Sequence, residues 1–479
     1  MNAVTAAVRL TDVQPILRID PTAPLDVAKA YISSRAEGEQ LPDLAYWQGE
    51  FWRALGTHYE QLTLDGLKAD IYGWLDTAAD PSGKPLKPHK RMVEGIIDAL
   101  KAAAHLSIAG APAWIGDSGD LPAADALISC RNGLLDISTK TLTPATRRYF
   151  TLNALDFDYT PDAQAPLAWL AFLRDLWGDD TESIETLQEV FGLALTSDTS
   201  HQKAFLLVGP RRSGKGTIAR VLTNLVGIGN VTAPTLSSVG QQFGLESALS
   251  KTLAIVSDAR IGRKADLDQI SENILRVTGE DAISVHRKFK PDWTARLRVR
   301  FVILSNELPT LLDQSGALAG RFIVLRLTRS FFGSEDRSLT PRLLAEMPGI
   351  MAWALQGLDR LRARGYFRQP ATSLEMVRQL EALSSPIKGF VEDRCILAPG
   401  ASIECRLLYE AWREWSQQQG REHAGSSQIF GRNLSAAFPE LSRTSLRVGG
   451  GRVRHYEGIR LRDAADAEGE AEDAEHIPF

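Results

Sequence analysis

The sequence predicts a multidomain protein of the α/β class, and three observations indicate this. A chain of 479 residues is long enough for about two to four domains. Short apolar runs at 205–208, 252–256 and 300–304 have the length of buried strands. A segment with apolar residues at helical spacing, 218–226, follows the first of these runs. Buried strands alternating with helices are typical of a parallel sheet covered by helices.

The regions around this α/β core have their own patterns. Trp47, Phe51, Trp52, Leu55 and Tyr59 are spaced i, i+4, i+5, i+8 and i+12, which predicts a helix, and residues 41–110 read as mostly helical. The pair Asn132-Gly133 between two apolar runs predicts a β-hairpin. We expect a helical α+β N-terminal domain. The domains expected are an arm or linker at 1–40, an N-terminal domain at 41–190, the α/β domain at 191–380, a small module at 386–462 and an acidic, disordered tail at 463–479.

A glycine-rich loop after the first strand indicates a phosphate site. Gly209 and Gly214 stand at the two ends of this loop, and Lys215 follows directly. Backbone N–H groups of such a loop, and of the helix that it opens, point at phosphate oxygens, and side chains there would block the approach. The expected nucleotide-binding residues are Gly209, Pro210, Arg211, Arg212, Ser213, Gly214, Lys215, Gly216 and Thr217. The expected cofactors are ATP and Mg²⁺.

One position departs from this motif. The residue after the lysine is normally Ser or Thr, whose hydroxyl ligates Mg²⁺, but here it is Gly216 and Thr217 comes next. Either Thr217 substitutes or water takes that place. Asp258 ends the second apolar run and is the expected acid that holds Mg²⁺. Asn306 follows the third run, where its amide could position water against the terminal phosphate.

The charge distribution suggests a polyanionic partner. The whole chain has a net charge of −5, yet residues 201–330 contain 19 Lys and Arg against 10 Asp and Glu. Residues 279–299 alternate like a hairpin whose centre mixes cations with an aromatic ring. Such a mixture suits a surface that follows a nucleic-acid backbone and stacks bases. The expected DNA-binding residues there are His286, Arg287, Lys288, Phe289 and Lys290.

These motifs, in this order, resemble those of the superfamily 3 helicases, and within them the phage and plasmid primase–helicase group, which is related to poxvirus primase–helicases. The resemblance includes the stretches NGLLD and SNELP and extends over roughly residues 40–460. It implies an AAA+-like ATPase that assembles as a hexamer around single-stranded DNA. By motif match, Lys215, Asp258, Asn306 and Arg321 would be catalytic, with Arg321 as the arginine finger that reaches a neighbour's ATP. Thr217 and Asp258 would ligate the metal.

Two points of the resemblance stay open. Many relatives have two acids or a glutamate where this chain has Asp258 alone, and Glu307 and Glu280 are unranked candidates for activating water. The family often carries a primase domain ahead of this region. Only about 40 residues precede it here, without a cluster of metal-binding acids, so we expect no primase activity in this chain.

The C-terminal module predicts a winged-helix domain. Helices at 407–415 and 428–438 precede a hairpin at 444–461 that turns at three glycines. Arg447, Arg452 and Arg454 are its expected DNA-binding residues, although a module that only packs on its neighbours is the alternative. The chain ends in acids followed by Ile477-Pro478-Phe479, which is similar to the C-terminal tip of bacterial single-stranded-DNA-binding proteins. Host replication proteins are therefore an expected partner, and a separate primase is another.

The function expected from the sequence is an ATP-dependent replicative DNA helicase of a phage, prophage or plasmid. A non-unwinding, DNA-stimulated ATPase or origin-binding initiator is the first alternative, and a small-molecule phosphotransferase is the second. No apolar run has the length of a membrane span, and the first residues lack a signal-peptide pattern. Three cysteines without metal spacing do not suggest a disulfide framework. We expect a protein of the bacterial host's cytoplasm, with no membrane partner.

Overall fold

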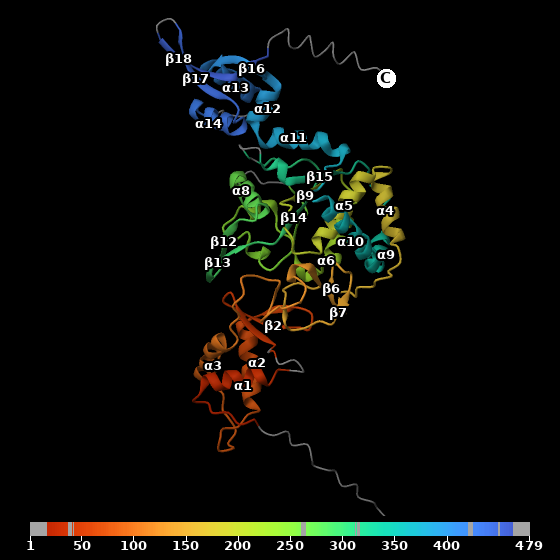
Figure 1. Cartoon of the computed structure of the whole chain (residues 1–479), viewed down its shortest axis with the longest axis vertical. Helices are drawn as coiled ribbons and strands as arrows, with labels where there is room; N and C mark the ends of the chain where they lie inside the picture. Colours follow the sequence, from red (N-terminus) through yellow and green to blue (C-terminus); the bar gives the residue numbers. More distant parts are fainter. Residues whose placement is uncertain are drawn as a thin grey trace, which may run out of the picture. The chain divides into compact units, whose positions relative to one another are not determined.

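The computed structural model describes residues 17–36, 41, 43–259, 265–311, 313, 317–419, 425–448 and 451–462. Figure 1 shows its helices and strands. The chain divides into two compact units, Met1–Ala163 with Gly227–Gly229, and Gln164–Val226 with Asn230–Phe479. The finer domain boundaries expected from the sequence stay predictions. No helix among the described residues is long and apolar enough to cross a membrane.

The first unit begins with a helix and a three-stranded antiparallel sheet in the order β1-β2-β3. The elements of this part are α1 (Pro24–Ser33), β1 (Leu44–Trp47), β2 (Glu50–Ala54), β3 (Tyr59–Leu62), α2 (Leu64–Asp76) and α3 (Lys90–Ala103). Val27, Ala28 and Tyr31 of α1 are buried in the same core as Leu67 of α2 and Ile96 of α3. The expectation of an arm or linker over 1–40 is therefore wrong for residues 24–33, because the apolar face of this helix completes a core.

The helix expected from the aromatic residues at 47–59 is also wrong. Trp47 ends β1 and pairs with Glu50 of β2 across a tight turn. The turn residues Gln48 and Gly49 have φ angles of 54° and 79°, a left-handed backbone that stops a helix. The aromatic side chains pack instead across the sheet, and the Trp47 and Trp52 rings lie 6.0 Å apart. The spacing of these aromatic residues is compatible with a helix and with a hairpin. The left-handed turn at Gln48-Gly49 selects the hairpin.

The remainder of the first unit consists of short strands. They are β4 (Ala113–Trp114), β5 (Leu127–Cys130), β6 (Gly133–Asp136), β7 (Leu142–Thr143) and β8 (Tyr149–Phe150). Cys130 pairs with Gly133 across the turn, so the hairpin expected at Asn132-Gly133 is confirmed. A Cβ atom at Gly133 would lie 2.3 Å from the Thr143 carbonyl oxygen, which explains the glycine at this position.

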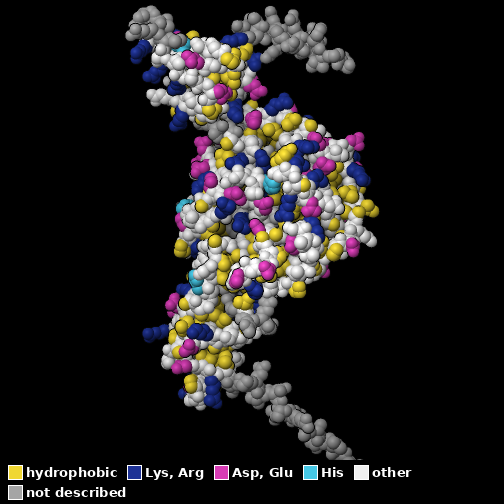
Figure 2. Space-filling model, viewed as in Figure 1, with side chains coloured by type: hydrophobic (Ala, Val, Ile, Leu, Met, Phe, Trp, Pro, Cys, Tyr) yellow, Lys and Arg dark blue, Asp and Glu magenta, His cyan; other side chains and the backbone are white. Residues whose placement is uncertain are grey.

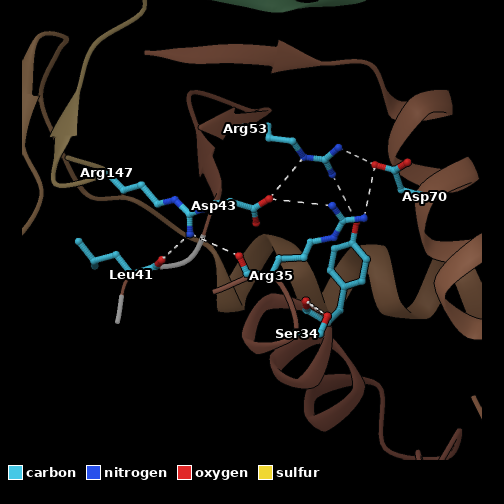
Figure 3. A network of polar contacts seen from close by, with 8 residues as sticks. Ser34, Arg35, Leu41, Asp43, Arg53, Asp70 and Arg147 are labelled. Carbon is cyan, nitrogen blue, oxygen red and sulfur yellow. Dashed lines mark hydrogen bonds and ion pairs between the residues drawn. The ribbon is translucent and has the colours of Figure 1, made fainter. Parts of the chain in front are cut away.

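A charged network joins Arg35 after α1 and Asp43 before β1 with residues of β2 and α2 (Figure 3). Arg53 Nη1 lies 2.6 Å from Asp70 Oδ2, and Arg53 Nε lies 3.7 Å from Asp43 Oδ2. The Arg35 guanidinium also lies near both acids, 4.0 Å from Asp43 and 3.8 Å from Asp70. Arg147 Nη1 donates to the Arg35 carbonyl at 3.3 Å. Burial raises the pKa of Asp43 above its ordinary value, and the nearby arginines oppose this rise.

The second unit is built on a five-stranded parallel sheet in the order β10-β11-β14-β9-β15 (Figure 1). Its strands are β9 (Ala204–Val208), β10 (Val231–Thr232), β11 (Leu253–Val256), β14 (Arg300–Ser305) and β15 (Phe322–Arg326). The three strands expected from the apolar runs are present. The last strand in chain order pairs with the first, so β9 lies between β14 and β15. The mixed α/β class expected from the sequence is confirmed.

Helices flank this sheet. They are α4 (Leu167–Trp177), α5 (Thr181–Ala194), α6 (Lys215–Val226), α7 (Leu236–Val239), α8 (Leu267–Thr278), α9 (Leu339–Ala345), α10 (Met347–Arg364) and α11 (Leu374–Ser384). Leu206 and Val324 share one core with apolar residues of α7, α8 and α11. The helices α5 and α10 cross closely, since a Cβ atom at Gly357 would lie 2.5 Å from the Gln188 carbonyl oxygen. Buried Glu189 pairs there with Arg360 at 2.8 Å.

The end of the second unit contains three helices and a three-stranded antiparallel sheet in the order β16-β18-β17. Its elements are α12 (Pro386–Arg394), β16 (Cys395–Glu404), α13 (Cys405–Gln418), α14 (Ser427–Ala437), β17 (Ser442–Val448) and β18 (Gly451–Leu461). The rings of Phe390, Trp412 and Phe430 meet in the core of this module. The two helices and the hairpin expected from the sequence are present. The strand β16 was not expected, because Pro399-Gly400, a typical turn pair, interrupts its apolar pattern.

Candidate functional site

Three functional candidates meet at one edge of the parallel sheet. Strands that run in the same direction present their carboxyl ends at the same edge, which is where open α/β sheets bind ligands. The loop 209–214 follows β9, Asn306 follows β14, and Asp258 follows β11 by two residues. Because β14 lies between the other two strands, Asn306 lies between the loop and Asp258 along this edge.

The loop has the close backbone packing that its glycines suggested. A Cβ atom at Gly209 would lie 2.4 Å from the Leu327 carbonyl oxygen. Gly214 has a φ of 89°, and a Cβ atom there would lie 2.9 Å from Leu176 Cδ2 and 3.1 Å from Phe172 Cζ, both on α4. Both positions therefore need glycine for space, and Gly214 also needs it for its backbone conformation. The helix α6 begins directly after the loop, at Lys215.

The ammonium group of Lys215 connects the loop with the neighbouring strand. It donates to the carbonyl oxygens of Gly209 at 2.7 Å and Pro210 at 2.8 Å, and to Ser213 Oγ at 3.1 Å. It also donates to Asn306 Oδ1 at 3.2 Å. Burial lowers the pKa of Lys215 below its ordinary value. The structure thus brings together two residues that lie 91 positions apart in the sequence.

The residues expected to hold Mg²⁺ lie at the same edge. Thr217 is in the first turn of α6, and its Oγ1 accepts from Arg220 Nη2 at 3.4 Å. Asp258 is exposed just beyond β11. A hydroxyl and a carboxylate are the oxygen ligands that Mg²⁺ takes beside a nucleotide, with water in its other positions. A Cβ atom at Gly216 would have only Arg220 Nη1 near it, at 3.9 Å, so this departure from the motif is not imposed by lack of space.

The structure separates the two acids that the sequence left unranked. Glu307 follows Asn306 and lies at the carboxyl edge of the sheet, where its backbone N–H donates to Ser305 Oγ at 3.4 Å. Glu280 accepts a hydrogen bond of 2.6 Å from Thr199 Oγ1, and Thr199 precedes β9. It therefore lies at the amino edge of the sheet, away from Lys215. Of the two acids, Glu307 is therefore the one at the edge where Lys215 and Asn306 lie.

Arg321 also lies at the amino edge. It ends a short 3₁₀ turn just before β15, and its guanidinium donates to the Gln202 side chain, which precedes β9. The next residue, Phe322, pairs with Ala204 at the start of β9. Five residues of β9 separate this edge from the loop, which is about 16 Å at the usual rise of a strand. The structure does not bring Arg321 to the Lys215 site of the same chain.

The basic hairpin expected at 279–299 is formed by β12 (Ala282–Arg287) and β13 (Lys290–Arg296). Lys288 and Phe289 make its turn, and Phe289 is 96% exposed. Lys288 Nζ lies 5.3 Å from the centre of the Phe289 ring. His286 is held at 3.0 Å by Asp292, and Arg287 lies over the Trp293 ring. Lys288, Phe289 and Lys290 are exposed at the tip.

The C-terminal arginines separate into two groups. Arg452 and Arg454 are exposed on β18. Lys and Arg side chains gather on the side of the module where β17 and β18 lie (Figure 2). Arg443, in contrast, binds the Tyr456 hydroxyl, and Arg462 donates to the Cys395 carbonyl at 3.2 Å, so both serve the packing of the module. The side chain of Arg447 lies outside the described part.

Two segments that lie beside the loop, α4 and the residues after β15, were not expected there from the sequence. Leu176 and Phe172 of α4 lie against Gly214, and Trp177 Nε1 donates to the Arg326 carbonyl at 2.8 Å. The segment after β15 also contacts the loop, through the Ser330 hydroxyl at 2.8 Å from the Arg211 carbonyl. Two adjacent aromatic residues, Phe331 and Phe332, in a polar segment directly after a buried strand were the available signal.

Comparison with known proteins shows a family similarity in the first half of the chain. Residues 46–178 match the family described as D5 N terminal like. That region is similar to the N-terminal part of D5 proteins. The match supports the relation to phage primase–helicases that the motifs indicate, and it does not extend to the residues of the parallel sheet. Residues 207–321, which include the loop, Asp258, Asn306 and Arg321, match a family of unknown function, DUF5906.

Two solved structures resemble the chain over most of its length. They are "The A form apo structure of NrS-1 C terminal region-CTR", at 12% identity and a TM-score of 0.49, and "The apo structure of NrS-1 C terminal region (305-718)", at 13% identity and a TM-score of 0.47. Each likeness covers 91% of this chain and 99% of that chain. Because both TM-scores are below 0.5, the fold is assigned from the strand order described above and not from these two structures.

Proposed function

We propose that this protein is an ATP-dependent DNA helicase that acts in the replication of a phage, prophage or plasmid. The observation that carries the proposal is the position of the Lys215 ammonium, between the glycine loop and Asn306 at the carboxyl edge of the sheet. A phosphate group bound at the loop would replace the Gly209 and Pro210 carbonyls as the acceptor for this ammonium. Asn306 would then lie beside the terminal phosphate, where an amide can orient the attacking water.

The finer fold is part of this proposal. The five parallel strands, with the loop strand β9 next to β14 and the acid-bearing β11 beyond it, support an AAA+-like P-loop core. Thr217 and Asp258 would hold Mg²⁺ in this core, and the ion would neutralise charge on the outer phosphates. Glu307 would accept the proton of the attacking water, since it follows Asn306 at the same edge.

The position of Arg321 supports an assembly in which neighbouring subunits share a site. A cation that stabilises phosphoryl transfer must contact the terminal phosphate. Arg321 lies at the edge of the sheet opposite to Lys215, so it would reach only the nucleotide of a neighbouring copy. A head-to-tail contact of this kind repeats from copy to copy, and it closes into a ring when the rotation between copies divides a full turn. We propose a hexamer, in which each Arg321 acts on the adjacent site.

Single-stranded DNA would bind at the β12–β13 hairpin and at the C-terminal module. Phe289 offers an exposed ring for a base, and Lys288 and Lys290 offer charges for phosphates. The module, with α14 ahead of the β17–β18 hairpin, would be a winged-helix domain whose wing carries Arg452 and Arg454. Its alternative role is packing alone. The Ile477-Pro478-Phe479 end lies outside the described residues, and its docking on host replication proteins stays a prediction, as does a separate primase.

The proposal is tested by strand separation on a forked duplex with a labelled strand, measured beside ATP hydrolysis with and without single-stranded DNA. We expect hydrolysis that rises with DNA and unwinding that requires ATP. DNA-stimulated hydrolysis without any strand separation would favour a non-unwinding ATPase or initiator. Transfer of phosphate to a small molecule, without an effect of DNA, would favour a phosphotransferase and contradict the helicase.

A further inference from the structure

The segment that follows β15 lies beside the glycine loop and is attached to it at three points. The Ser330 hydroxyl donates to the Arg211 carbonyl at 2.8 Å, and the Phe331 backbone N–H donates to the Arg212 carbonyl at 2.9 Å. Arg212 also lies 3.4 Å from the Glu335 carboxylate. Movement of this segment would therefore disturb the loop, and the segment belongs to the surroundings of any phosphate bound there.

The same segment is fixed on its other side by α4. Arg329 Nη1 donates to the Asp175 carbonyl at 3.0 Å, and the Arg329 guanidinium covers the Phe331 ring at 4.7 Å. The backbone N–H of Phe332 donates to Ser330 Oγ at 3.3 Å, and Gly333 turns the chain with a φ of 82°. These contacts hold the backbone of Phe332 in place, yet its side chain is 79% exposed. The Phe332 ring is therefore exposed at a fixed place beside the loop, where a ligand bound at the loop could contact it.

The direction in which a bound nucleotide would extend is fixed by the order of the strands. The residues that would receive the terminal phosphate and the metal, Asn306 and Asp258, follow β14 and β11, which lie on one side of β9. The nucleoside end of the molecule must then extend to the other side of the loop. The strand on that side is β15, and the segment that follows it places Phe332 there.

We propose that Phe332 is a nucleobase-binding residue, which stacks on the base of the nucleoside triphosphate whose phosphates bind at the loop. This inference rests on the proposed nucleotide site. Stacking on an aromatic ring uses the π-face that every base has, so it adds affinity with little choice between purines. Phe332 would therefore contribute to the affinity for the nucleoside part of the ligand. Gly214, Lys215 and the loop backbone would bind its phosphates.

The test compares two ligands that share the phosphates and differ in the base. Calorimetric titrations of the full chain with Mg²⁺-ATP and with Mg²⁺-tripolyphosphate are made for the wild type, Phe332→Ala and Phe332→Tyr. Loss of the ring should raise the Kd for ATP about tenfold, as removal of a base-stacking aromatic residue usually does, and leave the Kd for tripolyphosphate within about twofold. Phe332→Tyr keeps the ring and should bind ATP like the wild type. Tyr366→Ala removes another exposed aromatic residue, 58% exposed, and is the matched control without effect.

Three outcomes would overturn the inference. An unchanged Kd for ATP in a folded Phe332→Ala protein would show that the ring does not contact the base. Equal weakening of both ligands would show that the ring only supports the loop. An effect on single-stranded DNA binding alone would assign Phe332 to the nucleic acid. If the wild type bound neither ATP nor tripolyphosphate, the proposed nucleotide site itself would be wrong.

Discussion

Lys215 Nζ donates a hydrogen bond of 3.2 Å to Asn306 Oδ1, and this contact joins the glycine loop to the adjacent strand of the sheet. Carbonyl oxygens of the loop complete the environment of the ammonium at 2.7 Å and 2.8 Å. Burial lowers the pKa of this ammonium, which neutral oxygens hold in place. Phosphate carries full negative charge and is therefore a stronger acceptor for the same group. The roles expected of residues at this site and at the edges of the sheet can be tested by substitution.

The metal ligand can be identified by moving a hydroxyl along α6. If Thr217 ligates Mg²⁺, Thr217→Ala should lower ATP hydrolysis by at least about tenfold to a hundredfold, since even the loss of an outer-shell partner of a metal costs that much. There is space for a side chain at Gly216. Adding Gly216→Ser to the Thr217→Ala variant should therefore restore part of the ATP hydrolysis and its Mg²⁺ dependence. Gly216→Ala with Thr217→Ala is the control that adds a Cβ without a hydroxyl. Wild-type activity in Thr217→Ala would mean that water holds this position of the ion.

Arg321 should act on a neighbouring subunit. Arg321→Ala is expected to bind ATP with unchanged affinity and to lose hydrolysis, because the side chain lies at the edge of the sheet opposite to its own loop. Mixing it with Lys215→Ala protein should restore part of the activity, since some interfaces then combine an intact loop with an intact arginine. Turnover that stays absent in subunits shown to mix would count against a role in trans.

The hairpin tip should bind phosphates through its lysines. Lys288→Ala with Lys290→Ala is expected to weaken binding of single-stranded DNA, and the slope of log K against log salt should fall by about 0.7 for each phosphate that is no longer neutralised. Phe289→Ala should weaken binding without changing that slope, because stacking releases no counterions. Lys251→Ala, a change of the same type outside the hairpin, is the comparison. An unchanged slope in the double variant would assign phosphate binding to other residues, such as Arg452 and Arg454.

The charged network of the first unit should make stability depend on pH. Arg53→Ala leaves Asp43 buried with less positive charge nearby, so the folded-state pKa of this acid rises further above its unfolded value of 3.8. An acid with a raised folded pKa loses stability as pH rises through that pKa. The variant should therefore be close to the wild type near pH 4 and less stable by about 3 kcal/mol at pH 7. Denaturant unfolding at several pH values measures this difference.

A surface pair provides the control for that prediction. Lys68 lies 3.7 Å from Asp65, whose side chain is 96% exposed. Lys68→Ala should change the free energy of unfolding by no more than about 1 kcal/mol at either pH, since exposed ion pairs contribute little. A deficit of Arg53→Ala that is equal at pH 4 and pH 7 would show that packing, and not the charge of Asp43, causes the loss.

The predictable parts of the structure are those in which local sequence and tertiary structure agree. The strand at 204–208, the loop and the helix after it follow from apolar runs, two glycines and a lysine that are adjacent in the sequence. The aromatic residues at 47–59 were misread because their spacing also fits a helix, and only the backbone at Gln48-Gly49 separates the two. The helix at 24–33 was missed because it has only 10 residues, although Pro24 at its first position is a favourable helix start.

The residues of the candidate site were expected one by one from the sequence, whereas their arrangement in space was not. Sequence order does not reveal that β14 lies between β9 and β11, and this order brings Asn306 to Lys215. The same topology places Glu307 and Glu280 at opposite edges, which spacing alone left open. The contact of Ser330 with the loop depends on a pairing of β15 with β9 over a long sequence separation.

Hydrolysis of ATP at the loop around Lys215, stimulated by DNA, is the property on which the proposed function depends. It is measured as the rate of ATP hydrolysis by the full chain, with and without single-stranded DNA, in the wild type, in Lys215→Ala and in the surface control Lys101→Ala. We expect a rate that DNA increases in the wild type and in Lys101→Ala, and that is absent in a folded Lys215→Ala protein. Near wild-type, DNA-stimulated hydrolysis in Lys215→Ala would contradict the assignment of this loop as the ATPase site.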